Sequence, residues 1–142
     1  SIIGITSLPL ENSFTNAASR RHQAAHDTSS TIPIGDLLQY INEAIAIALT
    51  FDALLSYSKT KLINNNTAFL LNTTTIDQNS ISISFIKKET SRWKYKRRGR
   101  ANAVRTEADK NTLLTTSVPI SRANNECLIV YDESNKIVDW YT

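Results

Sequence analysis

At 142 residues the chain has the usual length of a single domain, enough to bury a hydrophobic core without covalent cross-links. It has only three glycines and no Gly-rich loop of the kind that cradles nucleotide phosphates, which argues against a P-loop or a dinucleotide-binding fold. Its one cysteine excludes an internal disulfide framework, and 16 Lys or Arg against 13 Asp or Glu give a net charge of +3.

The longest apolar stretch of the chain is interrupted by polar residues, namely Asn42, Glu43, Thr50 and Asp52. No run approaches the roughly 18 apolar residues that cross a bilayer, so the sequence predicts no membrane span. The first five residues lack a cationic segment and a long apolar run, and are not expected to form a signal peptide. A chain without methionine that begins with serine is expected to come from a longer protein.

The N-terminal part is predicted to be helical over residues 17–63, after an irregular arm at residues 1–16. Alanines between Asn16 and Asp27 indicate a short first helix, with the side chain of Asn16 as its N-terminal cap.

A longer second helix is predicted to begin at Asp36, which is a suitable cap. Apolar residues recur after it at spacings of three and four, as on the buried face of a helix. This helix should fade near residues 58–61, before Asn64–Asn66.

Residues 67–142 are predicted to be rich in β-strands, because apolar and polar residues alternate there. The segment Asp132–Asn135 indicates the turn of a closing hairpin. The predicted strands are Thr67–Asn72, Ser80–Phe85, Arg92–Arg98, Leu113–Val118, Cys127–Tyr131 and Lys136–Tyr141. The sequence therefore predicts one α+β domain over residues 1–142, with N-terminal helices packed on a C-terminal antiparallel β-sheet.

Positive charge is concentrated in one part of the chain. Residues 87–110 hold ten Lys or Arg against three Asp or Glu, a net charge of +7, whereas the segments before and after each have a net charge of −2. Cations this close repel one another, and a bound polyanion relieves the repulsion. Each nucleic-acid phosphate that the protein neutralises also releases counterions, which favours binding. The residues expected to face outward and contact phosphates are Arg92, Lys94, Lys96 and Arg98.

Other interpretations of this basic strand remain open. Trp93 and Tyr95 alternate with the cations, so they either stack on unpaired bases or point into the core. The cations themselves either bind an anionic partner or protect a solvated edge strand against aggregation. An acidic protein or an anionic membrane surface would suit the same charges.

The two histidines, His22 and His26, are four residues apart and share a face of the predicted first helix. No second cluster of ligands accompanies them, so neither a metal nor another cofactor is expected. Imidazoles suit the two proton transfers of RNA cleavage by 2′-hydroxyl transesterification, and a polar helix face without function is the alternative. Cys127 lies in an apolar strand, where a buried inert thiol is expected, and Tyr141 is a candidate active-site phenol.

The order of these parts resembles the ribonuclease toxin superfamily that groups barnase, EndoU nucleases, colicin ribonucleases and RelE. The resemblance is one of architecture and matches no signature motif: a helix with histidines at Arg21–Asp27, the basic strand at Arg92–Arg98, and the hairpin at Leu128–Thr142. An EndoU-like site would take histidines from separate positions plus a lysine, whereas both histidines here lie on one helix.

The resemblance implies a metal-independent endoribonuclease acting on RNA such as tRNA, with His22, His26 and Tyr141 as catalytic candidates. It also implies the C-terminal toxin domain of a secreted bacterial effector, as in contact-dependent inhibition. Such a toxin would act in the cytoplasm of a target cell and be neutralised by an acidic immunity protein. The alternative is a non-catalytic basic module, cytoplasmic or part of a viral or secretion-system assembly, that binds nucleic acid or an acidic protein.

Overall fold

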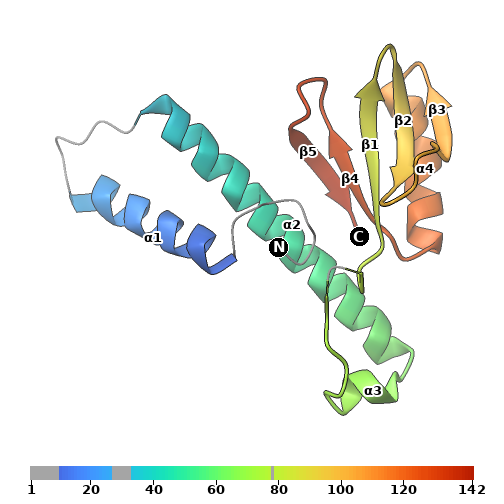
Figure 1. Cartoon of the computed structure of the whole chain (residues 1–142), viewed down its shortest axis with the longest axis horizontal. Coiled ribbons are helices and arrows are strands. Elements are labelled where there is room, and N and C mark those ends of the chain that lie inside the picture. The colour runs from blue at the N-terminus through green and yellow to red at the C-terminus, as the bar shows by residue number, and fades with distance from the viewer. Residues whose placement is uncertain (1–9, 27–32, 78) are drawn as a thin grey trace. The chain divides into compact units, whose positions relative to one another are not determined.

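The computed structural model describes residues 10–26, 33–77 and 79–142 (Figure 1). The chain divides into two compact units, residues 1–51 and 52–142. Helices occupy the N-terminal region and a five-stranded sheet lies in the C-terminal half, which confirms the α+β class. Residues 1–9 of the predicted arm and residues 27–32, before the second helix, lie outside the described residues.

Helix α1 spans Leu10–His26 and begins earlier than predicted. Asn16 therefore lies inside the helix and does not cap it, and the predicted irregular arm is wrong for residues 10–16. Glu11 lies in the first turn, where a carboxylate interacts favourably with the positive end of the helix dipole.

Helix α2 spans Ile34–Ile63 and is the long helix expected from the apolar spacing. Asp36 lies in its first turn, where its amide donates to the carbonyl oxygen of Pro33 at 3.0 Å, so it is not the cap. Among the described residues, α2 is long and apolar enough to cross a membrane, and 28% of its most apolar window is buried. The absence of a membrane span therefore stays a prediction.

The predicted strand at residues 67–72 is wrong, because the short helix α3 (Thr67–Leu70) occupies this position. The side chain of Asn66 accepts a hydrogen bond from the amide of Phe69 at 3.0 Å and so caps the first turn of α3. Asn65 and Asn72 on either side have φ values of 48° and 54°, in the left-handed region that asparagine tolerates.

The sheet has the strand order β3-β2-β1-β4-β5. Its strands are β1 (Ile83–Glu89), β2 (Arg92–Arg97), β3 (Arg105–Glu107), β4 (Cys127–Tyr131) and β5 (Ile137–Tyr141). Neighbouring strands are antiparallel except β1 and β4, which are parallel. The basic strand and the closing hairpin are confirmed, whereas the sheet is mixed and not fully antiparallel.

The parallel pairing depends on helix α4 (Lys110–Ala123), which connects β3 to β4 and occupies the predicted strand 113–118. Asp109 caps α4 by accepting hydrogen bonds from the amide and the hydroxyl of Thr112, at 2.7 and 2.9 Å. A parallel pair of strands needs a long crossover, usually a helix, and α4 supplies it. The prediction of a strand here is therefore wrong.

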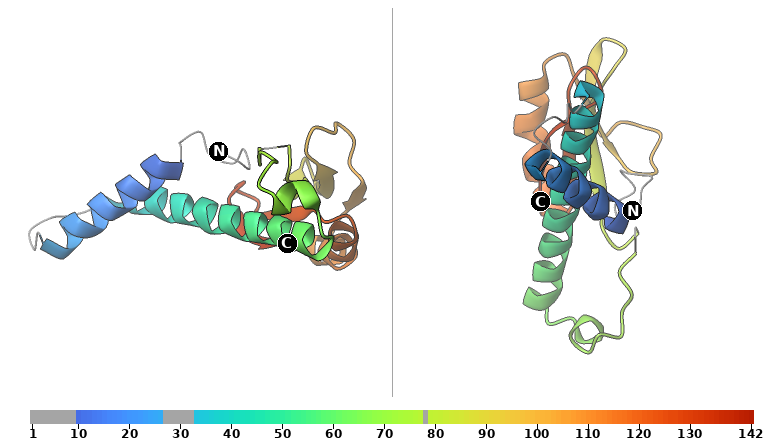
Figure 2. Two further views of the ribbon diagram at one scale, coloured as in Figure 1. Left: turned by 90° about the horizontal axis from the view of Figure 1, so that it is seen from below. Right: turned by 90° about the vertical axis from the view of Figure 1, so that its left-hand side faces the viewer.

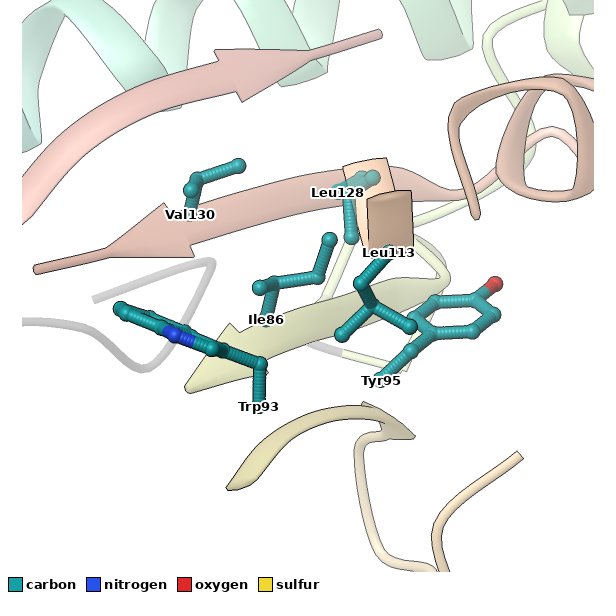
Figure 3. Packing of buried hydrophobic residues seen from close by; sticks show 6 residues of the cluster. All are labelled: Ile86, Trp93, Tyr95, Leu113, Leu128 and Val130. Atoms are coloured by element: carbon teal, nitrogen blue, oxygen red, sulfur yellow. The ribbon is translucent and has the colours of Figure 1, made fainter. Parts of the chain in front are cut away.

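Helix α4 lies against one face of the sheet, and the core of the second unit forms between them (Figure 2). Leu113 of α4 is fully buried among the side chains of β1, β2 and β4 (Figure 3). The buried cluster consists of Ile86, Trp93, Tyr95, Leu113, Leu128 and Val130. Residues 52–63 of α2 belong to the same unit, where Asp52 accepts a hydrogen bond from the indole of Trp140 at 2.8 Å.

We expect Leu113→Ala to lower the free energy of unfolding by about 2–5 kcal/mol, because it leaves a cavity in a close-packed core. Urea denaturation measures this change. Thr115→Ala, on the exposed side of the same helix, is the control and should stay within about 0.5 kcal/mol of wild type. Equal effects of the two substitutions would show that α4 does not pack as described.

Candidate anion-binding groove

The basic strand β2 is an inner strand, paired with β1 on one side and with β3 on the other. The interpretation of its cations as protection for an edge strand is therefore wrong. Trp93 and Tyr95 are 6% and 0% exposed and belong to the core cluster, so they cannot stack on bases. Because side chains alternate along a strand, Lys94 and Lys96 lie on the opposite face.

That opposite face carries a groove of about 230 Å³. Strand β1 places Lys87 opposite Lys94 and Phe85 opposite Lys96. The chain turns after β2 at Gly99, whose φ of +73° is favourable for glycine. The described cations that line the groove are Lys87, Lys94, Lys96, Arg97, Arg98 and Arg100, and the described carboxylate that lines it is Glu89.

Glu89 at the end of β1 holds two of the predicted phosphate contacts. Its Oε2 lies 3.0 Å from Nζ of Lys94, and its Oε1 lies 2.6 Å from Nζ of Lys96. The hydrogen bonds from Lys96 and then Lys94 lower the pKa of Glu89, so this carboxylate stays charged at neutral pH. The groove therefore contains one internal counter-ion that brings the two ammonium groups together.

Arg97 is anchored by a second carboxylate, Glu126, which is 6% exposed. Nε of Arg97 lies 2.5 Å from Oε1 of Glu126, and the hydroxyl of Tyr95 donates to Oε2 at 2.6 Å. Burial and the bond to Glu126 raise the pKa of Tyr95, and the charge of Glu126 raises the pKa of Arg97. This cluster joins the core of the sheet to the basic end of β2.

The other two predicted phosphate contacts differ in position. Arg98 lines the groove, and its guanidinium donates to the carbonyl oxygen of Ile81 at 3.2 Å. Burial lowers the pKa of Arg98, but a guanidinium stays charged in proteins. Arg92 is exposed at the first position of β2, opposite Glu89, and is not among the lining residues.

His22 and His26 form a separate pair on α1, in the first unit. Both are exposed, and their ring centroids are 4.4 Å apart. The neighbouring Arg20 donates to the carbonyl oxygen of Asp36 at 3.2 Å. Within residues 10–26, 33–77 and 79–142, no group of three or more His, Cys, Asp or Glu is arranged to hold a metal ion.

Tyr141 lies on the edge strand β5, separated from the basic strand by β1 and β4. Its hydroxyl donates to Oδ2 of Asp139 at 2.8 Å, and this hydrogen bond raises the pKa of the phenol. Its ring packs against the core cluster beneath α4. The structure therefore does not bring Tyr141 together with the lysines of the groove.

Cys127 lies at the start of β4, where it is 4% exposed. Burial raises the pKa of its thiol from 9.0 to about 12, so the reactive thiolate is scarce at neutral pH.

The sequence prediction missed both carboxylates of the site, Glu89 and Glu126. The turn Glu89–Arg92 between two alternating segments is a signal for the hairpin that returns Glu89 to the basic strand. Glu126 has no such local signal, because its contacts depend on β4 lying beside β1.

No protein-family model, curated protein or solved structure matches the chain.

The raised pKa of Cys127 gives a test of this part of the fold. At pH 8 we expect iodoacetamide to label the urea-unfolded chain about a thousandfold faster than the folded protein, because burial keeps the folded thiol protonated. The unfolded thiol ionises above pH 9 while the folded thiol does not, so stability should fall as the pH rises from 9 towards 12. Equal labelling rates for the two states would contradict the burial of Cys127.

Proposed function

We propose that the chain binds the phosphate backbone of RNA through the groove on β1 and β2. The observation that supports this proposal is the concentration of six cations around one groove that has a single carboxylate among its described lining residues. Cations in such a groove raise the local concentration of anions and guide them to the site. Guanidinium groups also form paired hydrogen bonds with phosphate oxygens.

The inner position of β2 favours phosphate binding over a protective role for the cations. An edge strand needs charge to prevent pairing with other chains, whereas β2 already has a neighbour on each side. The burial of both aromatic residues of β2 further suggests that affinity comes from phosphates and not from stacking of bases. Sequence-independent binding with strong salt dependence is then expected.

Binding is measured by fluorescence anisotropy with labelled RNA over a series of salt concentrations. The double variant Lys94→Ala, Lys96→Ala should weaken binding and lower the slope of log K against log[salt] by about one for each phosphate that is no longer neutralised. Lys136→Ala, an exposed lysine at the opposite edge of the sheet, is the matched control and should bind like wild type. Unchanged affinity and an unchanged slope in the double variant would refute RNA binding by the groove.

Glu89→Gln should have the opposite effect on the same measurement. It removes the negative charge that pairs with Lys94 and Lys96, so both ammonium groups become available to phosphates. We expect RNA to bind several-fold more tightly to this variant at low salt, with the gain fading as salt screens the charges. Weaker binding would mean that Glu89 positions the lysines for the ligand and does not compete with it.

A second candidate function is metal-independent cleavage of RNA by 2′-hydroxyl transesterification. The exposure of His22 and His26 supports it, because an exposed imidazole can reach a phosphate and can accept the hydroxyl proton or protonate the leaving oxygen. In this candidate the chain is the toxin domain of a secreted effector that acts on an RNA such as tRNA in the target cell. Its basic groove would then be covered by an acidic immunity protein.

Incubation of the protein with total RNA in EDTA tests this candidate. Cleavage should persist without metal, and either His22→Ala or His26→Ala should lower its rate by about 10²–10⁴-fold. Gln23→Ala, on the same exposed stretch of α1, is the control and should leave the rate unchanged. If the RNA stays intact after incubation with the wild type, the cleavage function is refuted and RNA binding remains as the proposed function.

A further inference from the structure

The groove does not end at β2. A second hollow of about 250 Å³ adjoins it, and Arg97, Arg98 and Arg100 line both. Ile81 and Ser82, just before β1, form another side of this second hollow together with Glu126. Because three cations are common to both hollows, the groove and the second hollow lie next to each other on one basic surface.

A third and larger hollow of about 420 Å³ lies where the C-terminal end of α2 meets the starts of β1 and β4. It shares Ile81, Ser82 and Glu126 with the second hollow, so the three hollows adjoin one another in order and are called the track below. Its volume falls within the range of about 300–1,000 Å³ that is usual for ligand sites. All three hollows are formed by residues 52–142.

The third hollow adds cations from elements that are distant in sequence from the basic strand. Lys59 and Lys61 come from α2, and Arg122 comes from the last turn of α4. Glu126, which lines the second and third hollows, and Glu89, which lines the groove, already have cationic partners. With the six cations of the groove, these three make a basic track that extends well beyond the segment where the sequence concentrates its charge.

We propose that this track holds one extended single strand of RNA, with its first phosphates in the groove and a terminal nucleotide in the third hollow. The proposal rests on RNA binding by the groove and specifies the form of the ligand. Single-strand sites on OB folds, for comparison, span about 4–16 nucleotides. Duplex DNA is stiff over about 150 base pairs, whereas a single strand bends at every nucleotide and can adapt to hollows in succession.

The third hollow differs from the groove in having neutral polar groups next to its cations. Asn125, between α4 and β4, and Ser56 of α2 line it with an amide and a hydroxyl. Asn124 and Thr60 line it too, but they already donate to the carbonyl oxygens of Ile120 and Ser56, so they offer mainly acceptor oxygens. Amides and hydroxyls bind the edges of unpaired bases, whereas the groove offers mainly charge. The track therefore combines phosphate contacts at one end with groups that suit a base at the other.

The test compares uridine oligomers of about 4 and about 12 nucleotides, which represent the short and long ends of single-strand sites. Their 2′-O-methyl forms are used, since these lack the hydroxyl that transesterification requires. Lys59→Ala and Arg122→Ala remove one cation each from α2 and α4, and both side chains are exposed, so the fold should persist.

We expect each of these variants to weaken binding of the long oligomer about three- to tenfold while the short oligomer binds as it does to wild type. The double variant Lys94→Ala, Lys96→Ala should weaken binding of both oligomers.

If Lys59→Ala and Arg122→Ala change the binding of neither oligomer while the groove double variant weakens both, the site ends at the groove and the track is refuted. If the groove variant also has no effect, RNA binding itself fails. A duplex of the long length that binds as tightly as the single strand would refute the preference for one strand.

Discussion

The burial of Trp93 and Tyr95 beneath α4 is the constraint on which the rest of the second unit depends. Successive side chains of a strand point to opposite faces, so fixing these two rings also fixes Lys94 and Lys96 on the other face. A register shift by one residue would exchange the two sets and bury cations in the core, at a cost of several kcal/mol for each uncompensated charge. Hydrophobic packing on one face of the sheet therefore creates the electrostatic surface on the other.

Tyr95 connects the two faces chemically. Its ring belongs to the core, while its hydroxyl donates to the buried carboxylate of Glu126, which also holds Arg97. A buried carboxylate without partners is strongly unfavourable, so the hydroxyl and the guanidinium together make the position of Glu126 possible. In return, Glu126 fixes Arg97 at the point where the groove and the second hollow meet.

The fold was predictable where local pattern and tertiary structure agree. Alternation indicated the basic strand and the closing hairpin, and apolar spacing indicated α2. Prediction failed where a capping residue starts a helix in a segment that resembles a strand. Asn66 caps α3 and Asp109 caps α4, and the residues after each cap are rich in Thr and Leu, which suggested strands. Because α4 was missed, so were the parallel pairing of β1 with β4 and the position of Glu126. Of the predicted phosphate contacts, Lys94, Lys96 and Arg98 line the groove and Arg92 does not, and Lys87, Arg97 and Arg100 line it without having been predicted as contacts. The counter-ions were missed because they depend on contacts between separate strands.

The two carboxylates of the basic track differ in how readily an anion can replace them. Glu89 is about as exposed as its lysine partners, and such surface ion pairs contribute only about 0–1 kcal/mol, so a phosphate can displace it at small cost. Glu126 is buried and bonded on both oxygens, and removing it from Arg97 would leave an unpaired charge in the interior. Glu89 therefore pairs with Lys94 and Lys96 in the free protein and, under the proposed binding, would give way to the anion, while Glu126 would stay paired with Arg97. The site thus combines a replaceable counter-ion, Glu89, with a permanent one, Glu126. In the free protein both carboxylates reduce the repulsion among the cations of the groove while the cations stay directed into it.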